Sequence, residues 1–148
     1  MRIALCSDEP YPVHATVRAW LEGRGHEVVP FGSIETGAET AWAPAAERAA
    51  LSVASGECEM GIFFCWTGTG ISIAANKVAG IRAALCTEPG QAAAARVWNH
   101  ANVLCLSNRV LSDDMAKETL AAWFDTAPGE RGTAGVEQLA AVDARHRR

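Results

Sequence analysis

The chain has 148 residues, of which 49% are hydrophobic and 20% charged, and its net charge is −4. This length suits one domain with its own core, and the composition excludes an intrinsically disordered chain. The acidic balance argues against a protein whose main task is to neutralise nucleic-acid phosphates, and no apolar run is long enough for a membrane span. The apolar start Met1–Cys6 is too short for a signal peptide, so we expect a cytoplasmic protein without a membrane or nucleic-acid partner.

Apolar runs alternate with helical patterns along the whole chain. The expected strands, in chain order, are residues 2–6, 27–31, 60–65, 81–86 and 101–107. The expected helices are residues 13–23, 44–54, 71–78 and 89–98, a helix from the cap at Ser112 to Phe124, and residues 136–148. Strands that alternate with helices indicate parallel βαβ units. We therefore predict a single α/β domain over residues 1–148, a Rossmann-like three-layer sandwich around a five-stranded parallel sheet.

Ligands of such sheets bind at the carboxyl ends of the strands, which selects the turns 7–11, 66–70, 87–90 and 107–109. The strongest local signal is Cys65–Ser72, where a strand ends on a thiol and a turn with two glycines leads into a helix. Backbone N–H groups in such a turn favour an anion or a developing oxyanion. The turn is not a Walker loop, because the Gly-Lys-Ser/Thr ending is missing, and no arginine follows at the spacing of a cysteine phosphatase.

Three side chains near these turns each have two interpretations. Cys65 is either a buried hydrophobe or a base, because a helix N-terminus favours the thiolate that could take a proton from carbon beside a carbonyl. Asp8 is either a turn acid or a group that binds ligand hydroxyls. His100, with Asn99, precedes the last strand and so lies at the opposite edge of the sheet, where it is a surface histidine or reaches a neighbouring subunit's site.

The other cysteines carry no chemical signal. None of the five forms a C-x-x-C pair, so zinc and thioredoxin chemistry have no support. Cys6, Cys86 and Cys105 sit in or at the end of apolar runs, which predicts small buried hydrophobes.

Three segments together resemble a known family. They are Cys-x-Thr-Gly-x-Gly-x-Ser-Ile-Ala-Ala-Asn-Lys at 65–77, Gly-Ile-Arg-Ala-Ala-Leu-Cys at 80–86 and Asn-x-Ala-Asn-Val-Leu-Cys-Leu at 99–106. They are similar to the sugar-phosphate isomerases that include ribose-5-phosphate isomerase B and the galactose-6-phosphate isomerase subunits. The resemblance covers nearly the whole chain. It implies a homodimer or a tetramer with sites at the subunit interface, a contribution of the loop and helix at about 125–148 to that interface, and no metal or organic cofactor.

The resemblance also implies roles for individual residues. The family reaction is aldose–ketose isomerisation through an enediolate, with Cys65 as the base and Thr67 as an assisting hydroxyl. A second branch of the family uses a carboxylate at the position of Ile71, so this chain resembles the thiol branch. The remaining matches are the anion hole formed by the backbone of Trp66, Gly68, Thr69 and Gly70, the sugar-hydroxyl contacts of Asp8 and Asn99, and the phosphate contacts of Arg109 and Arg131.

Several positions depart from the family pattern. Glu9 stands where a histidine usually helps to hold phosphate, and Trp66 replaces a loop glycine. Trp98 stands where the family has its ring-opening histidine, with His100 two residues further on as a catalytic candidate. The family has a pair of arginines near its C-terminus, and of this pair only Arg131 is present here. We therefore expect an isomerase of a small sugar or sugar phosphate other than ribose 5-phosphate; a non-catalytic sugar- or anion-binding protein, or an accessory isomerase subunit, is the alternative.

Overall fold

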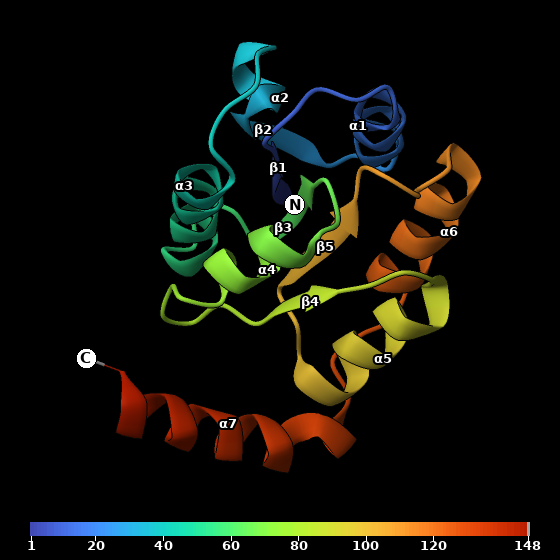
Figure 1. The fold of residues 1–148 in the computed structure, drawn as a ribbon. Helices are drawn as coiled ribbons and strands as arrows, with labels where there is room; N and C mark the ends of the chain where they lie inside the picture. The colour runs from blue at the N-terminus through green and yellow to red at the C-terminus, as the bar shows by residue number, and fades with distance from the viewer. Residues whose placement is uncertain (148) are drawn as a thin grey trace.

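A computed structural model describes residues 1–147, which form a five-stranded sheet between two layers of helices (Figure 1). The strands are β1 (Arg2–Ser7), β2 (Glu27–Gly32), β3 (Met60–Cys65), β4 (Ala83–Leu85) and β5 (Val103–Ser107). Their order is β2-β1-β3-β5-β4, and every pairing is parallel. The predicted α/β sandwich with a five-stranded parallel sheet is confirmed.

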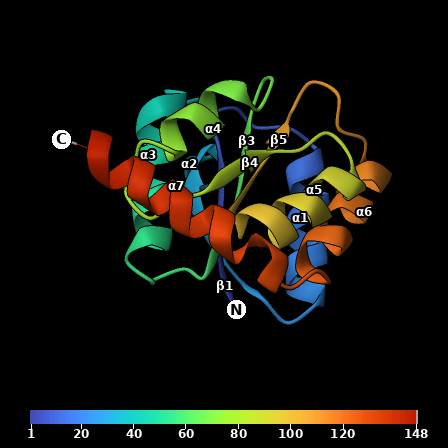
Figure 2. The same ribbon diagram turned by 90° about the horizontal axis from the view of Figure 1, so that it is seen from below.

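The helices divide between the two faces of the sheet (Figures 1 and 2). One face is covered by α1 (Val13–Gly23), α5 (Pro89–Asn99) and α6 (Asp113–Phe124), and the other by α3 (Trp42–Ala54) and α4 (Thr69–Ala75). Side chains alternate along each strand, so β1 sends Ile3 and Leu5 to the first face and Ala4 and Cys6 to the second. Both faces of the sheet are therefore buried, as the continuous apolar runs of the strands predicted.

The structure differs from the sequence prediction at β4, which has three residues instead of six. At its start, two asparagine side chains form the hydrogen bonds to backbone groups that a neighbouring strand would otherwise form. The Asn76 amide donates to Ala83 O at 2.9 Å and accepts from Ala83 N at 2.8 Å, while Asn102 Oδ1 accepts from Arg82 N at 2.8 Å. Asn102 itself precedes the ladder, so β5 begins at Val103 rather than at residue 101.

Smaller differences occur in the helices. The short helix α2 (Ser33–Thr36) was not predicted, α3 begins two residues before the expected position, and α4 covers Thr69–Ala75 rather than residues 71–78. The C-terminal segment forms a 3₁₀ turn (Glu130–Gly132) and α7 (Thr133–His146); the expected helix end at Arg148 lies outside the described residues. No helix in the described part of the chain is both long and apolar enough to cross a bilayer.

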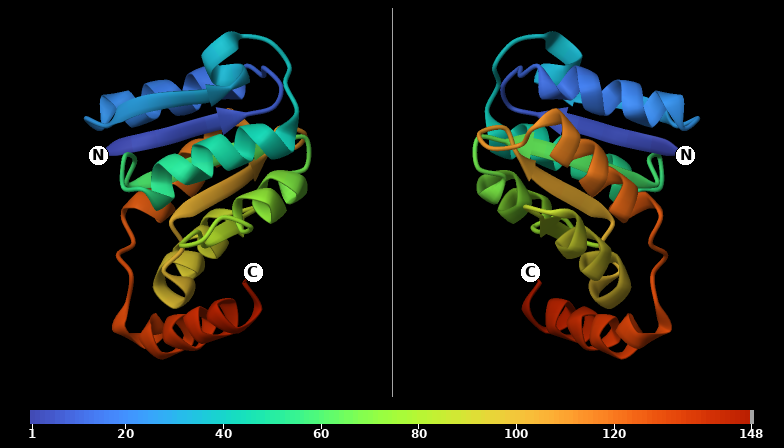
Figure 3. Two further views of the ribbon diagram at one scale, coloured as in Figure 1. Left: turned by 90° about the vertical axis from the view of Figure 1, so that its left-hand side faces the viewer. Right: turned by 90° about the vertical axis from the view of Figure 1, so that its right-hand side faces the viewer.

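Helix α7 lies apart from the sheet, alongside α5 (Figure 3). Within the described chain none of its residues is buried, and Leu139 keeps 47% of its surface exposed. An amphipathic helix normally buries its apolar stripe against a neighbour. The apolar side chains of α7 are therefore available to a further contact.

The Asn76 contact gives a first testable prediction. Replacing Asn76 by alanine removes two hydrogen bonds to Ala83, and we expect unfolding by urea to show a loss of about 1–2 kcal/mol. Asn76→Asp keeps an acceptor but loses the amide donor, so it should cost less than the alanine variant. An alanine variant as stable as the wild type would show that β4 does not depend on this side chain.

Candidate active site

The carboxyl ends of β1, β3 and β5 lie next to one another, because these strands are neighbours in the sheet. The strand register pairs Ser7 with Phe64 and Cys65 with Ser107, so the turns that follow them begin at the same edge. Backbone bonds join two of the turns: Asn108 N donates to Cys65 O at 2.9 Å and Arg109 N to Trp66 O at 3.0 Å. The fold thus brings the turns that carry Asp8, Glu9, Cys65, Trp66 and Arg109 to one place.

The turn after β3 depends on its first glycine. Gly68 has a φ of 79°, and a Cβ there would meet Leu85 Cδ1 at 2.5 Å and Leu106 O at 3.1 Å. Only glycine meets both conditions without strain. The hydroxyls of Thr67 and Thr69 lie 2.6 Å apart, and Thr67 Oγ1 also accepts from Thr69 N at 3.4 Å. Thr67, Gly68 and Thr69 therefore hold the turn at the start of α4 in a fixed shape.

Aromatic side chains pack against this turn. The Trp42 ring lies over Gly70, where an added Cβ would meet Trp42 Cε3 at 3.2 Å. The Trp66 and Tyr11 rings are 5.9 Å apart and join the β1 turn to the β3 turn. Tyr11 lies in the selected turn 7–11 but was given no role, and Trp42 was not selected, since a single aromatic residue in a loop gives no local signal.

Cys65 differs from the other cysteines by its position at the end of a strand. All five cysteines are buried and free, which confirms the interpretation of Cys6, Cys86 and Cys105 as small buried side chains. Burial raises the pKa of Cys6 to about 12, with the charge of Asp8 adding to the effect, and raises the pKa of Cys86 to about 11. The pKa of Cys105 is also raised well above its usual range by burial. These three thiols stay protonated at neutral pH. Cys65 is the residue that precedes the glycine turn.

The β1 turn adds carboxylates to the site. Asp8 is only 7% exposed, and its Oδ1 accepts no hydrogen bond from any of residues 1–147. Burial raises the pKa of Asp8, and the nearby charges of Glu9 and Glu39 act in the same direction. The Tyr11 hydroxyl donates to Glu9 Oε2 at 3.1 Å. A buried acceptor of this kind suits a ligand hydroxyl, which can donate to it.

Four other predicted site residues lie at the opposite edge of the sheet, within the same chain. His100, at a φ of 45°, ends α5, and its Nε2 is 2.8 Å from Gly129 O. The Arg131 guanidinium lies 5.1 Å from the centre of the Trp98 ring. Arg82 donates to the carbonyl oxygens of Asn99 at 3.1 Å and of His100 at 3.0 Å. We call Trp98, Asn99, His100 and Arg131 the second cluster. Its place at the edge opposite the Cys65 turn agrees with the sequence analysis, in which Asn99 and His100 precede the last strand.

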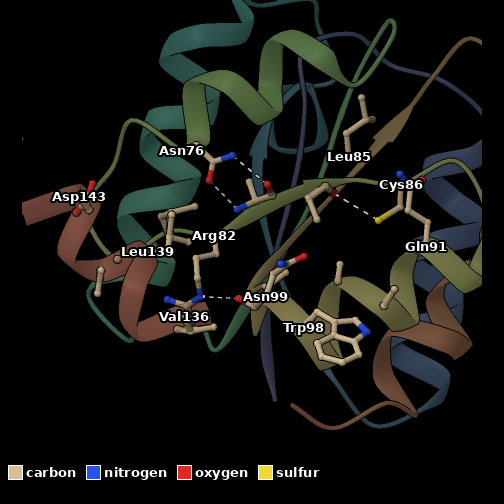
Figure 4. Close-up of a pocket in the computed structure, with 18 of the residues that line it drawn as sticks. Asn76, Arg82, Leu85, Cys86, Gln91, Trp98, Asn99, Val136, Leu139 and Asp143 are labelled. Atoms are coloured by element: carbon tan, nitrogen blue, oxygen red, sulfur yellow. Dashed lines mark hydrogen bonds between the residues drawn. The ribbon is translucent and has the colours of Figure 1, made fainter. Parts of the chain in front are cut away.

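An apolar groove of about 700 Å³ runs along β4 between α5 and α7 (Figure 4). Its lining includes Trp98 and Asn99 of the second cluster, Leu85 and Cys86 at the end of β4, and Leu139 of α7. Leu85 is also the side chain against which Gly68 packs. The groove therefore shares one side chain, Leu85, with the packing of the β3 turn.

The sequence analysis missed a buried pair behind the site. His14 of α1 and Asn108 after β5 are 7% and 8% exposed, and His14 Nε2 lies 2.7 Å from Asn108 Oδ1. Asn108 falls in the selected turn 107–109, so its position could have been found. His14 could not, because its partner is 94 residues away in the chain. No group of three or more His, Cys, Asp or Glu side chains within residues 1–147 is arranged to hold a metal ion.

Known proteins of similar sequence and structure share one reaction type. A family model described as Ribose/Galactose Isomerase matches residues 3–139. Ribose-5-phosphate isomerase B of Escherichia coli is 39% identical over 141 residues, 95% of this chain and 94% of that protein. A D-erythrulose-4-phosphate isomerase of Pectobacterium atrosepticum is 37% identical over 74% of this chain and 72% of its own length. The solved ribose-5-phosphate isomerase B of Clostridium thermocellum superposes with a TM-score of 0.91 at 37% identity, over 99% of both chains.

Proposed function

The chain belongs to the ribose/galactose isomerase family, and from this premise we propose that it interconverts the aldose and ketose forms of a small sugar or sugar phosphate. The single observation that carries the proposal is Cys65 at the end of β3, beside the glycine turn and the unpaired carboxylate oxygen of Asp8. The resemblance found in the sequence is confirmed by these relatives, and their names state the predicted reaction class. We place the enzyme in the cytoplasm, in agreement with the expectation from the sequence.

The proposed reaction moves one proton between adjacent carbons. The Cys65 thiolate removes the proton from C2 of the open-chain aldose, which leaves an enediolate with its negative charge on O1. The Cys65 thiol then returns a proton to C1, while O1 takes up a proton and the O2 hydroxyl loses one to become the ketose carbonyl. Backbone N–H groups of the turn Trp66–Gly70 stabilise the negative enediolate oxygen, and the Thr67 hydroxyl assists. Asp8 binds a substrate hydroxyl through its free Oδ1. Neither a metal nor an organic cofactor takes part in this scheme.

The test is exchange of the substrate's C2 hydrogen with deuterium from solvent, followed by NMR. Four- to six-carbon aldoses and their phosphates form the panel, with matched phosphorylated and unphosphorylated pairs. We expect exchange with at least one sugar of the panel. Binding of a sugar without any exchange would favour the alternative, a non-catalytic binding protein or accessory subunit, for which Trp98 in place of a ring-opening histidine is the supporting feature.

We include the second cluster in this scheme through a homodimer, and two such dimers would form a tetramer. We propose that a partner copy packs into the groove along β4, with the segment 125–148 contributing, and that it carries its second cluster to the Cys65 turn of the first copy. In that arrangement Asn99 and His100 contact the sugar and Arg131 contacts its distal end. The apolar groove beside the second cluster and the exposed apolar side chains of α7 support this proposal.

The β1 turn is unfavourable for a substrate phosphate. Asp8, Glu9 and Glu39 are near one another, and Arg109 supplies a positive charge after β5. A like charge at about 4 Å costs roughly 1–4 kcal/mol in environments between bulk water and a protein surface. We therefore expect the protein to bind ribose 5-phosphate more weakly than relatives with a cationic residue at the position of Glu9.

Replacing Glu9 by glutamine tests this expectation. Loss of the carboxylate charge should strengthen the binding of ribose 5-phosphate or erythrose 4-phosphate by about fivefold or more, which corresponds to roughly 1 kcal/mol. Titration calorimetry with each phosphate and its parent sugar measures the difference. Glu22→Gln is the matched control, since Glu22 is exposed on α1 and pairs with Arg18. An equal gain for phosphorylated and unphosphorylated sugars would contradict a charge effect.

A further inference from the structure

A chain of hydrogen bonds runs behind the candidate site from α1 to the β1 turn. His14 Nε2 lies 2.7 Å from Asn108 Oδ1, and Asn108 Nδ2 donates to Ser7 Oγ at 3.2 Å. Ser7 Oγ in turn donates to Glu9 O at 2.8 Å. All members are buried or half-buried, so each interaction is protected from water.

The bonding partners determine the form of the histidine. Tyr11 N donates to His14 Nδ1 at 3.3 Å, so Nδ1 is the unprotonated nitrogen and the proton is on Nε2. Nε2–H then donates to Asn108 Oδ1, which leaves the Asn108 amide free to donate to Ser7. Every donor in the chain faces an acceptor, and this holds only for neutral His14.

Asn108 connects this chain of bonds to the reacting group. Its backbone N donates to Cys65 O, while its side chain contacts His14 and Ser7. The His14 ring also packs on Phe64, the neighbour of Cys65, with 4.7 Å between ring centres. One buried pair therefore fixes the ends of β1, β3 and β5 relative to one another.

We propose that His14 and Asn108 are positioning residues, which hold the Asp8–Glu9 turn in register with the Cys65 turn without touching the substrate. Their catalytic effect rests on the proposed isomerase function. Misplacing reacting groups by about 1 Å can cost roughly 100-fold in rate. We accordingly expect loss of the pair to lower kcat by about 10- to 100-fold.

Protonation of His14 provides a readout that ordinary packing lacks. A second N–H at Nδ1 would oppose the Tyr11 N–H and break the hydrogen bond by which the histidine holds the β1 turn. Burial lowers the pKa of His14 below its ordinary value of 6.5, and the bond to Asn108 opposes this shift in part. Activity should therefore fall on the acid side, below pH 6.5. The Tyr11 ring lies 6.2 Å from the His14 ring, measured between ring centres. The other ionisable groups on the turns that this network joins are Asp8 and Glu9 after β1, Cys65 at the end of β3 and Arg109 after β5.

The variants separate packing from hydrogen bonding. His14→Phe keeps an aromatic ring against Phe64 but removes both polar contacts, whereas His14→Gln keeps a donor for Asn108. We expect kcat for C2 exchange to fall about 10- to 100-fold in His14→Phe, less in His14→Gln, and not at all in the matched control His26→Gln. His26 suits this purpose because its ring stacks on Phe124 and bonds the chain's N-terminus.

Asn108→Asp tests the same network through pH. A carboxylate beside His14 raises the pKa of the imidazole, so the acid limb of the kcat profile should move to higher pH than in the wild type. If His14→Phe does not fold, the test rests on Asn108→Asp, through its acid limb, and on Asn108→Ser, which should show the expected loss of kcat. Wild-type kcat and an unchanged acid limb in these variants would overturn the proposal.

Two measurements remain informative even without turnover. Nitrogen-15 NMR at pH 7.5 should show His14 protonated on Nε2 alone, and alkylation of Cys65 by iodoacetamide should change at least about threefold in His14→Phe but not in His26→Gln. If no sugar exchanges its C2 hydrogen, the proposed function fails while these results still decide the role of the pair. A His14 proton on Nδ1, or equal alkylation rates, would refute the network.

Discussion

Replacing Cys65 by alanine is expected to remove C2 hydrogen exchange almost entirely, by about a thousandfold or more, while the fold and sugar binding persist. A positioned acid–base group contributes roughly 10²–10⁴ to a rate, and the proposed site has no second thiol at the end of a central strand. Cys65→Ser should be almost as damaging, because a hydroxyl is a far poorer source of an anionic base at neutral pH. NMR detection of exchange with the best sugar of the panel measures the effect.

The buried cysteines are the controls for this prediction. Cys105→Ala and Cys86→Ala remove thiols that stay protonated, so they should lower the free energy of unfolding and leave exchange per folded molecule unchanged. Circular dichroism and urea unfolding verify that Cys65→Ala is folded. Exchange at the wild-type rate in that variant would eliminate the thiol as the base.

Mixing two impaired variants should restore activity if the sites are shared between subunits. Cys65→Ala removes the base, and Arg131→Ala removes a charged contact that the partner supplies, at an expected cost of about 10- to 100-fold. When subunits exchange at random, half of the dimers are mixed, and each mixed dimer has one site with both residues. About a quarter of the wild-type activity should therefore return.

The mixture requires its own controls. Each variant is assayed alone at the same total concentration, and sedimentation measures the dimer before and after mixing. Cys65→Ala mixed with Cys65→Ser should regain nothing, since no pairing of these chains contains an intact base. A monomer with full activity, or a mixture no more active than Arg131→Ala alone, would rule out the shared site.

The sheet was predictable because its signal is local. Short apolar runs between turn residues located all five strands, and the helices between them predicted that the strands are parallel. The shortening of β4 was not predictable in the same way, because it depends on side chains of Asn76 and Asn102 that replace strand neighbours. Apolar periodicity does not record which polar side chain folds back on a backbone group.

The candidate site likewise has a part that local sequence signals predict and a part that depends on contacts between distant residues. Asp8, Cys65 and Arg109 could be grouped in advance, because each follows a strand and parallel strands end at one edge. The His14–Asn108 pair joins residues 94 positions apart, and neither has a motif of its own. In the proposed dimer the roles of Trp98 and Arg131 depend on a second copy of the chain, so sequence reasoning on one chain could place them but not assemble the site.

The asparagine contacts at β4 have a consequence for how copies of this protein can associate. The backbone groups of Ala83 point away from β5 and are already occupied by the Asn76 amide, so in this three-residue strand only Leu85 still presents outward backbone groups. An open strand edge invites edge-to-edge pairing and aggregation. Here the Asn76 side chain leaves a single residue of that edge open, which is too short for a strand ladder. A subunit that approaches β4 therefore associates mainly through side chains rather than by extending the sheet.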